Sequence, residues 1–321
     1  MNYNFPIIGI GASAGGLEPL ELFFEYAKLT SNFSYVLIQH LAPNHKSLMD
    51  ELLARHTKLP ILIIEHDMPL EQGKLYLNPP KKFVELHEGR FVLSEKEDRK
   101  LSFPISTFFN SLAEQLHEKA CAIIFSGTGS DGSDGIKFIK EKGGLVLAQS
   151  PETAKFDGMP RSAILTGAVD KICTVQHMHQ ELESYFQNNL ELMQIKMESQ
   201  DSKSIIASIL QAVFQKLGVD FTEYKYTTVS RRIARRMSLL GFTEMDKYLH
   251  YLKETISEAQ LLSKELLIGV TRFFRDEESF YYLKNKVIPQ IIDANEETKS
   301  IRVWVTACST GEEAYTIAIL I

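Results

Sequence analysis

The stretch that decides the fold is residues 6–16, which read PIIGIGASAGG. A short apolar run ends in a glycine-rich turn that carries a single serine, Ser13, and an amphipathic segment begins at Leu17. This order predicts a strand, a sharp turn and a helix, and the glycines permit the turn to be tight. Ser13 is therefore expected at the mouth of the helix, where free N–H groups favour negative charge.

Three interpretations compete for this turn. The dinucleotide fingerprint GxGxxG requires a third glycine where Ala14 stands, and the next apolar run ends in Gln39 and His40 rather than in a carboxylate. The nucleophile-elbow pattern GxSxG matches residues 11–15. The simplest alternative is that Ser13 only caps the helix. The turn alone does not decide between the last two interpretations.

Composition limits the classes of protein to consider. The 321 residues are enough for about two domains, and 44% hydrophobic with 24% charged residues is typical of a soluble globular protein. A net charge of −6 gives no case for nucleic-acid binding. The three cysteines have no metal-ligand spacing, which favours a reducing, cytoplasmic location. Neither a signal peptide nor an apolar run of about 18 residues is present, so we expect no membrane insertion.

Strand-like and helix-like patterns alternate over residues 1–173. Most strand patterns are continuous apolar runs, which favours a parallel sheet with helices on both faces, a three-layer α/β fold. Between 73 and 94 the period changes to two, which predicts an antiparallel hairpin region on one edge of the sheet. The expected strands are 6–11, 33–39, 60–64, 120–126, 144–148 and 168–172, and the expected helices are 16–28, 46–56, 104–118, 132–142 and 160–166.

Polar residues follow three of these strands. Ser13 follows the first, His40 ends the second, and Asp131 lies just past the strand that ends near residue 126. Ligands of open α/β sheets bind at this carboxyl edge. Taken singly, these residues could be a helix cap, a loop histidine and a turn aspartate. Together they supply a nucleophile, a base and a carboxylate that orients the base. Their order differs from the Ser, Asp, His order of α/β-hydrolases, which indicates a separate solution to the same chemistry.

Five segments resemble the CheB-type protein-glutamate methylesterases, and the resemblance extends in order over residues 5–173. The segments are GIGASAGG at 9–16, VLIQHLAP at 36–43, SGTGSDG at 126–132, GGLVLAQ at 143–149 and FDGMPRSA at 156–163. The resemblance implies a hydrolase that demethylates glutamate γ-methyl esters on chemoreceptor helices, often with glutamine deamidation, and that needs no cofactor. It carries the catalytic triad over to Ser13, His40 and Asp131.

The resemblance also assigns supporting residues. Backbone N–H groups at the glycine-rich turn are candidates for the oxyanion site, and we expect support from Gly11, Ala14, Gly15, Gly16 and Thr128. Thr128 is a departure, because stand-alone members have methionine there. A second departure is that only a few residues precede the first strand, so the receiver domain usual in stand-alone members is not expected here.

The second half of the chain is helical in pattern. Residues 176–203 are expected as a helical linker and 204–285 as an all-α domain. Residues 229–237 read VSRRIARRM, and helical spacing stacks Arg231 over Arg235 and Arg232 over Arg236. Stacked like charges cost free energy, so this basic helix predicts an acidic protein partner, the alternative being a solvated face. Interleaved aromatic residues, which nucleic-acid binding would favour, are absent.

The last segment is similar to the CheR-type methyltransferases, which methylate receptor glutamates with S-adenosylmethionine. That resemblance assigns Thr271, Arg275 and Glu312 to cofactor binding, whereas Gly269 stands where stand-alone members have asparagine. It also assigns the arginine helix, with Arg231, Arg232, Arg235 and Arg236, to receptor docking. Residues 286–321 are expected to form the first strand, at 301–305, and the first helix of a truncated Rossmann-type domain. We therefore expect no tight binding of S-adenosylmethionine and no methyltransferase activity without further strands.

The leading hypothesis is an esterase of chemotaxis adaptation that acts on the cytoplasmic helices of chemoreceptors. The alternative is a non-catalytic signalling scaffold that binds acidic receptor helices, and a dinucleotide-dependent oxidoreductase is a distant third. The sequence leaves the receptor, the regulation of the esterase and the oligomeric state open.

Overall fold

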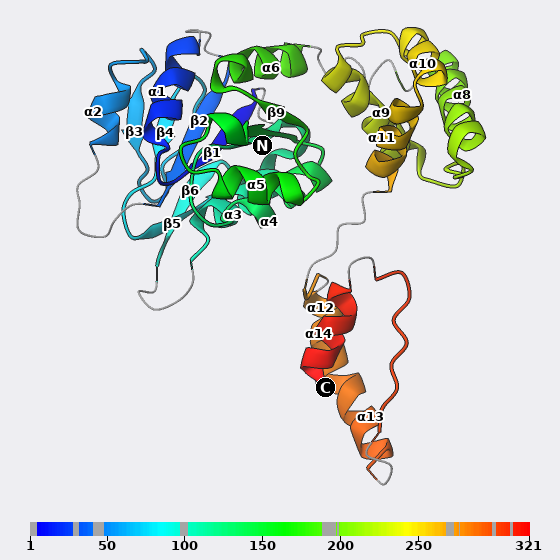
Figure 1. The fold of residues 1–321 in the computed structure, drawn as a ribbon. Helices are drawn as coiled ribbons and strands as arrows, with labels where there is room; N and C mark the ends of the chain where they lie inside the picture. Colours follow the sequence, from blue (N-terminus) through cyan, green and yellow to red (C-terminus); the bar gives the residue numbers. More distant parts are fainter. Residues whose placement is uncertain are drawn as a thin grey trace. The chain divides into compact units, whose positions relative to one another are not determined.

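The computed structural model describes residues 5–27, 32–40, 48–96, 102–187, 197, 199–267, 273–275, 277–296, 300–308 and 311–321. It divides into two compact units, 1–266 and 267–321. The first unit contains an α/β domain and a bundle of helices, drawn from blue to yellow in Figure 1. The second unit is helical and is described separately below.

A seven-stranded sheet forms the centre of the α/β domain, and all its strand pairs are parallel (Figure 1). The strand order is β3-β4-β2-β1-β7-β8-β9, which places β1 (Ile7–Ala12) in the middle. Every residue of β1 is buried, as expected for a parallel strand covered on both faces. The other strands are β2 (Ser34–Gln39), β3 (Ile61–Ile63), β4 (Leu75–Leu77), β7 (Ala120–Ile124), β8 (Leu145–Gln149) and β9 (Lys171–Cys173).

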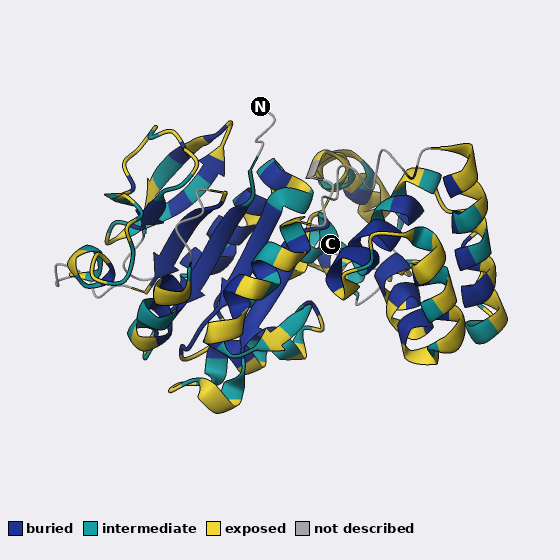
Figure 2. Ribbon diagram, turned by 90° about the horizontal axis from the view of Figure 1, so that it is seen from above, coloured by how far each residue is buried: buried dark blue, intermediate teal, exposed yellow. Residues whose placement is uncertain are grey.

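Helices cover both faces of this sheet, and Figure 2 shows the buried strands between half-exposed helices. One face packs against α1 (Leu17–Tyr26), α2 (Met49–Leu53) and α6 (Val175–Gln187). The other packs against α3 (Pro104–Leu116), α4 (Ser133–Glu141) and α5 (Gly158–Leu165). A Cβ on Gly11 of β1 would lie 2.5 Å from Ile105 Cγ2, so this glycine lets α3 approach the strand closely.

The predicted hairpin is present, but its position differs from the expectation. Strands β5 (Lys82–His87) and β6 (Arg90–Glu95) pair with each other in a separate antiparallel sheet, packed on α3 rather than on an edge of the main sheet. Strand β4 lies between β2 and β3 and runs parallel to both. Three buried residues are too few for their period to separate a parallel core strand from a hairpin strand.

Helix α6 also differs from the expectation of a linker that begins at residue 176. Its apolar face is buried in the core of the α/β domain through Val175, Met178, Leu182 and Tyr185. Burial of four large side chains in one core makes this helix a layer of the domain.

The bundle consists of α8 (Gln200–Leu217), α9 (Tyr226–Leu240), α10 (Met245–Glu254) and α11 (Ile256–Leu266) around a core of its own, as the helical pattern predicts. Ser199 precedes helix α8 and its side chain accepts a hydrogen bond from the N–H of Ser202, and Gly218 follows the helix with φ +71°. These are an N-cap and a left-handed C-cap. The segment expected as an all-α domain therefore begins with a helix that is capped at both ends.

The second unit contains α12 (Glu277–Tyr282), the π-helix η3 (Leu283–Val287), α13 (Ile288–Ala294) and α14 (Glu312–Leu320). Residues 301–305, expected as a strand, pair with no other strand in the described part of this unit. A strand is stable only when a neighbour takes its N–H and C=O groups. Trp304 in this segment is 91% exposed. Across the described residues, no helix has both the length and the apolar character needed to cross a bilayer.

Candidate functional site

Three residues lie at the carboxyl ends of three adjacent strands. Ser13 directly follows β1, His40 directly follows β2, and Asp131 lies in the loop between β7 and α4. Because β2 and β7 pair with β1 on either side, their carboxyl ends share one edge of the sheet. The structure thus places the three residues at the edge where open α/β sheets bind ligands.

Asp131 is the best anchored of the three. It is 5% exposed, and its Oδ2 lies 2.7 Å from His40 Nε2. The same carboxylate accepts hydrogen bonds from the backbone N–H groups of Ile105 and Ser106, each at 3.0 Å, and of Gly132 at 2.8 Å. Ile105 and Ser106 belong to the first turn of α3, so Asp131 takes up N–H groups that the helix leaves unpaired. These bonds fix the direction in which the carboxylate meets His40.

His40 pairs with the buried Asp131 and is itself partly exposed to solvent. Its side chain is 39% exposed, and its Nε2 is occupied by Asp131. The ring therefore has Nδ1 left for a second hydrogen bond, which is the arrangement of a base oriented by a carboxylate. No hydrogen bond joins His40 to Ser13 in the described structure, and catalytic hydrogen bonds are often long in enzymes without substrate.

Ser13 does not cap the helix that follows it. The N-cap of α1 is Gly16, without a side-chain hydrogen bond, and the structure shows no partner for Ser13 Oγ among the described residues. The backbone of Ser13, in contrast, is hydrogen-bonded at both its N–H and its C=O. Its N–H donates to Ser126 O and its C=O accepts from Gly16 N–H, both at 3.0 Å. Gly15 adopts φ +69°, a conformation that favours glycine. The hydroxyl is thus half-buried on a tightly bonded turn.

The bonds of this turn identify which N–H groups could stabilise an anion. The N–H groups of Ser13 and Gly16 are both used, whereas those of Ala14 and Gly15 have no acceptor in the described part of the chain. They lie beside the N-terminus of α1, where the helix dipole favours negative charge. Of the other supporting residues, Gly11 lies inside β1, and Thr128 is exposed in the loop that leads to Asp131.

Lys96 is a charged neighbour that the sequence did not indicate. Its ammonium lies 5.5 Å from the centre of the Phe83 ring. Burial lowers the pKa of Lys96, and the nearby Asp131 acts in the opposite sense. It follows directly after β6, a strand of the separate hairpin sheet, so only the tertiary fold brings it near Asp131.

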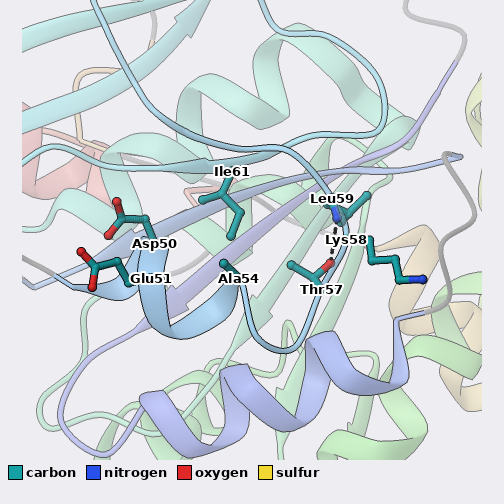
Figure 3. Close-up of a pocket in the computed structure, with 7 residues that line it drawn as sticks. All are labelled: Asp50, Glu51, Ala54, Thr57, Lys58, Leu59 and Ile61. Atoms are coloured by element: carbon teal, nitrogen blue, oxygen red, sulfur yellow. Dashed lines mark hydrogen bonds between the residues drawn. The ribbon is translucent and has the colours of Figure 1, made fainter.

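The described residues offer no metal site, and the hollow found among them lies away from the three strand-end residues. No group of three histidine, cysteine, aspartate or glutamate side chains could hold a metal ion there. A hollow of about 390 Å³ lies beside α2, and Figure 3 shows its lining, which includes Asp50, Lys58 and Ile61. None of the predicted site residues lines it, so this hollow does not mark the candidate active site.

The predicted docking arginines require a correction. Arg235 is 1% exposed and Arg232 is 6% exposed, so neither presents its charge to a partner in this structure. Arg236 pairs within the bundle with Glu258, at 2.6 Å. Arg231 is partly exposed and lies 3.4 Å from Glu118 of the α/β domain. The helical spacing was read correctly, but the acidic partner of these arginines lies within the same unit.

The buried arginines bind the end of α4. Arg232 donates to the backbone oxygens of Lys140 at 3.1 Å and Glu141 at 2.8 Å, and Arg235 donates to that of Gly144 at 2.8 Å. These oxygens belong to the C-terminal end of α4 and the turn after it, where cations are favoured.

Two carboxylates complete the cluster. Arg235 Nη2 lies 2.5 Å from Asp170 Oδ2, and Arg235 Nη1 lies 2.8 Å from Glu265 Oε1. Lys140 Nζ lies 3.0 Å from Asp170 Oδ1. Burial alone would raise the pKa of Asp170, but the charges of Arg235 and Lys140 outweigh it and lower that pKa. We call Arg232, Arg235, Lys140, Asp170 and Glu265 the arginine clasp.

The residues assigned to S-adenosylmethionine lie at or beyond the start of the second unit. Thr271 and the departure Gly269 lie outside the described residues, Arg275 is exposed, and Glu312 is the first residue of α14. Nucleotide-type cofactors bind at the carboxyl edge of a sheet, and the described residues of this unit contain no paired strand. These residues alone do not assemble a cofactor site.

Comparison with protein families divides the chain into three segments. Residues 8–182 match the family described as CheB methylesterase. Residues 205–267 match the all-alpha domain of CheR methyltransferase, and residues 269–321 match its SAM binding domain.

Individual relatives cover different shares of the chain. An uncharacterized 104.1 kDa protein of Rhodobacter capsulatus is 35% identical over 294 residues, which are 85% of this chain and 31% of that protein. Protein-glutamate methylesterase/protein-glutamine glutaminase 2 of Anaeromyxobacter dehalogenans is 30% identical over 55% of this chain and 52% of its own length. The crystal structure of the Thermotoga maritima CheB methylesterase catalytic domain superposes with a TM-score of 0.52 at 26% identity. That alignment covers 56% of this chain and 98% of that one. The present chain thus spans about a third of the Rhodobacter relative and about half of the Anaeromyxobacter relative.

Proposed function

Because the chain belongs to the CheB methylesterase family and continues into CheR methyltransferase domains, we propose that it hydrolyses glutamate γ-methyl esters on chemoreceptor helices. The observation that carries this proposal is the pairing of His40 with the buried Asp131 at the sheet edge where Ser13 lies. The Ser13 hydroxyl has no hydrogen-bond partner among the described residues. A nucleophile, a base and an orienting carboxylate are the parts that ester hydrolysis by a serine enzyme requires.

The first half of the reaction forms an acyl-enzyme. Ser13 Oγ attacks the ester carbonyl while His40 Nδ1 takes the hydroxyl proton. Asp131 keeps the imidazole oriented through Nε2 and stabilises the imidazolium. The N–H groups of Ala14 and Gly15 are the proposed donors to the oxyanion. When the tetrahedral intermediate collapses, the C–O bond to the methoxy group breaks, and His40 returns the proton so that methanol leaves.

The second half restores the enzyme. Water attacks the acyl-serine and gives one proton to His40, and the bond between the carbonyl carbon and Ser13 Oγ breaks. The proton returns to Ser13, and the glutamate leaves as a carboxylate. Glutamine deamidation would follow the same steps with ammonia as the leaving group.

The alternative is a non-catalytic scaffold whose domains bind acidic receptor helices. Two of the four arginines proposed for docking are buried in the clasp, so these two do not support that alternative. S-adenosylmethionine is the cofactor expected for the methyltransferase domain. The esterase needs no cofactor in the proposed mechanism.

Methanol release tests the proposal. The substrate is a synthetic receptor-helix peptide that carries one glutamate γ-methyl ester, and the protein is the full 321-residue chain. We expect release by the wild type, and a loss of at least about 1,000-fold in Ser13→Ala. Ser130→Ala is the matched control, because Ser130 is an exposed serine in the neighbouring Asp131 loop. Equal release by the wild type and Ser13→Ala, or none above the spontaneous rate, would contradict the proposal.

A further inference from the structure

Ser126 is a fully buried serine next to the glycine-rich turn at residues 13–16, which we call the nucleophile turn. It lies just past β7 and is 0% exposed. Its Oγ accepts a hydrogen bond from Phe156 N–H at 3.0 Å and lies 3.0 Å from Ala14 O and 3.2 Å from Phe156 O. Since a hydroxyl has one proton, Oγ donates to one of these two carbonyls at a time. The side chain therefore ties the residue after the nucleophile to the loop that precedes α5.

The backbone of Ser126 holds the nucleophile as well. Its carbonyl accepts the N–H of Ser13 at 3.0 Å. One residue thus bonds the turn on both sides of the Ser13 side chain, at the N–H of Ser13 and at the C=O of Ala14. Two such bonds restrict rotation of the backbone that carries Ser13 Cβ.

Gln149 anchors Ser126 in turn. It is the last residue of β8 and is 2% exposed. Its Oε1 accepts the N–H of Ser126 at 2.9 Å, and its Nε2 donates to Thr153 O at 3.0 Å. We call Ser126 and Gln149 the turn brace. A buried, fully bonded polar network of this kind is rigid, because each lost bond leaves an unpaired group.

Packing leaves no spare room around the brace. A Cβ on Gly15 would lie 3.0 Å from Ser126 Oγ, and one on Gly127 would lie 2.9 Å from Ser13 Cβ and 2.1 Å from Met159 Sδ. The nucleophile turn therefore rests directly on residues 126 and 127. Movement of Ser126 would move Ser13.

We propose that Ser126 is a positioning residue of the esterase, which holds the Ser13 hydroxyl and the N–H groups of Ala14 and Gly15 in reactive geometry. This inference rests on the proposed function, in which those groups attack the ester and stabilise the oxyanion. Ser126 itself touches neither substrate nor His40. A displacement of about 1 Å at a reacting group can lower the rate about 100-fold.

The test compares Ser126→Ala with Ser133→Ala in the full chain. Ser133 is the first residue of α4, and its buried Oγ has no hydrogen-bond partner in the described structure. We expect Ser126→Ala to lower kcat for methyl-ester hydrolysis about 10- to 100-fold with KM within about twofold. Ser133→Ala should leave both constants unchanged. Rates are measured at 15 °C per folded protein, with the folded fraction taken from far-UV circular dichroism.

Two further measurements separate positioning from loss of fold. Gln149→Leu keeps the size of the side chain and removes the acceptor of Ser126 N–H, so it should lower kcat in the same direction. If Ser126→Ala does not fold, the kcat of Gln149→Leu tests the positioning role of Ser126 in its place. The midpoint of the pH–rate profile should stay at the wild-type value in both variants, because the brace does not contact His40.

The outcomes also separate this inference from the proposed function. If the wild type is active and both Ser126→Ala and Gln149→Leu keep the wild-type kcat, the positioning role of Ser126 is wrong. The esterase proposal would then remain intact. A raised KM at unchanged kcat would overturn it as well, because the brace would then act on binding. A wild type without esterase activity would overturn both proposals.

Discussion

His40 Nε2 lies 2.7 Å from Asp131 Oδ2, and the carboxylate that makes this contact also binds the first turn of α3. Asp131 therefore has two roles, one towards a partly exposed imidazole and one towards a buried helix terminus. Three backbone N–H groups donate hydrogen bonds to its carboxylate, and these bonds fix the orientation of the carboxylate independently of His40. The geometry of the proposed catalytic site and the stability of α3 are thereby coupled through one side chain.

The first prediction concerns Asp131→Asn. An amide presents one NH2 group to a set of four donors, so it loses acceptors for α3 and holds His40 in the wrong tautomer. We expect ester hydrolysis to fall about 10,000-fold, as in other triads, and stability to fall by about 1–3 kcal/mol. Hydrolysis rates and urea unfolding measure the two effects. A stable variant with unchanged activity would show that Asp131 has neither role.

The second prediction concerns additivity. Ser13→Ala and His40→Ala should each remove most of the activity, and the double variant should lose little more, because the two residues act as one unit. The measurement is the rate of methyl-ester hydrolysis for the four proteins of the cycle. Multiplicative losses would show that Ser13 and His40 act independently, and the triad assignment would then be wrong.

Much of the α/β domain could be predicted because its strands and their ends are marked by residues that are close together in the sequence. The continuous apolar runs predicted a parallel sheet, and the polar residues at their ends predicted which edge would hold Ser13, His40 and Asp131. The helix-cap alternative for Ser13 could not be settled from the turn alone. It depended on where α1 begins, and the structure places the N-cap at Gly16.

The features that sequence reasoning missed depend on long-range contacts. Asp170 and Arg235 are 65 residues apart, and nothing in the pattern of α9 indicates that its arginines face the end of α4. The role of Ser126 was missed for the same reason, because its partners Ala14, Gln149 and Phe156 come from three other segments. The strand expected at 301–305 shows the converse, since an apolar run forms no ladder where none of the described residues pairs with it.

The third prediction concerns the arginine clasp. Arg235→Ala leaves Asp170 and Glu265 buried with only Arg232 and Lys140 nearby, so we expect a loss of about 3–5 kcal/mol in the free energy of unfolding. Lys247→Ala is the control, because it removes an exposed pair with Glu244 that contributes at most about 1 kcal/mol. Urea unfolding of the full chain measures both. Equal stability of the two variants would mean that the clasp contributes nothing beyond an exposed ion pair.

The last prediction is the pH dependence of the clasp. Burial raises the pKa of Asp170, but Arg235 and Lys140 lower it further, so its folded pKa lies below the ordinary value of about 3.9 for an aspartate. A group with a depressed folded pKa binds more protons in the unfolded state. Its contribution to stability is therefore fully present above the unfolded pKa, and it is lost as the pH falls through the folded pKa.

Asp170→Asn should accordingly be less stable than the wild type by a constant amount from pH 7 down to about pH 5. The difference should shrink progressively as the pH falls below about 4, where the unfolded chain binds the proton, and it should vanish once the pH is below the folded pKa, where the wild-type carboxyl is neutral in both states. Urea unfolding at a series of pH values measures this difference. Asp134→Asn provides the control, because Asp134 is 83% exposed and pairs only with Lys137 in the described structure, so its difference should stay near zero throughout. A difference for Asp170→Asn that persists unchanged at the lowest pH would show that the variant acts through packing rather than through the charge that Arg235 binds.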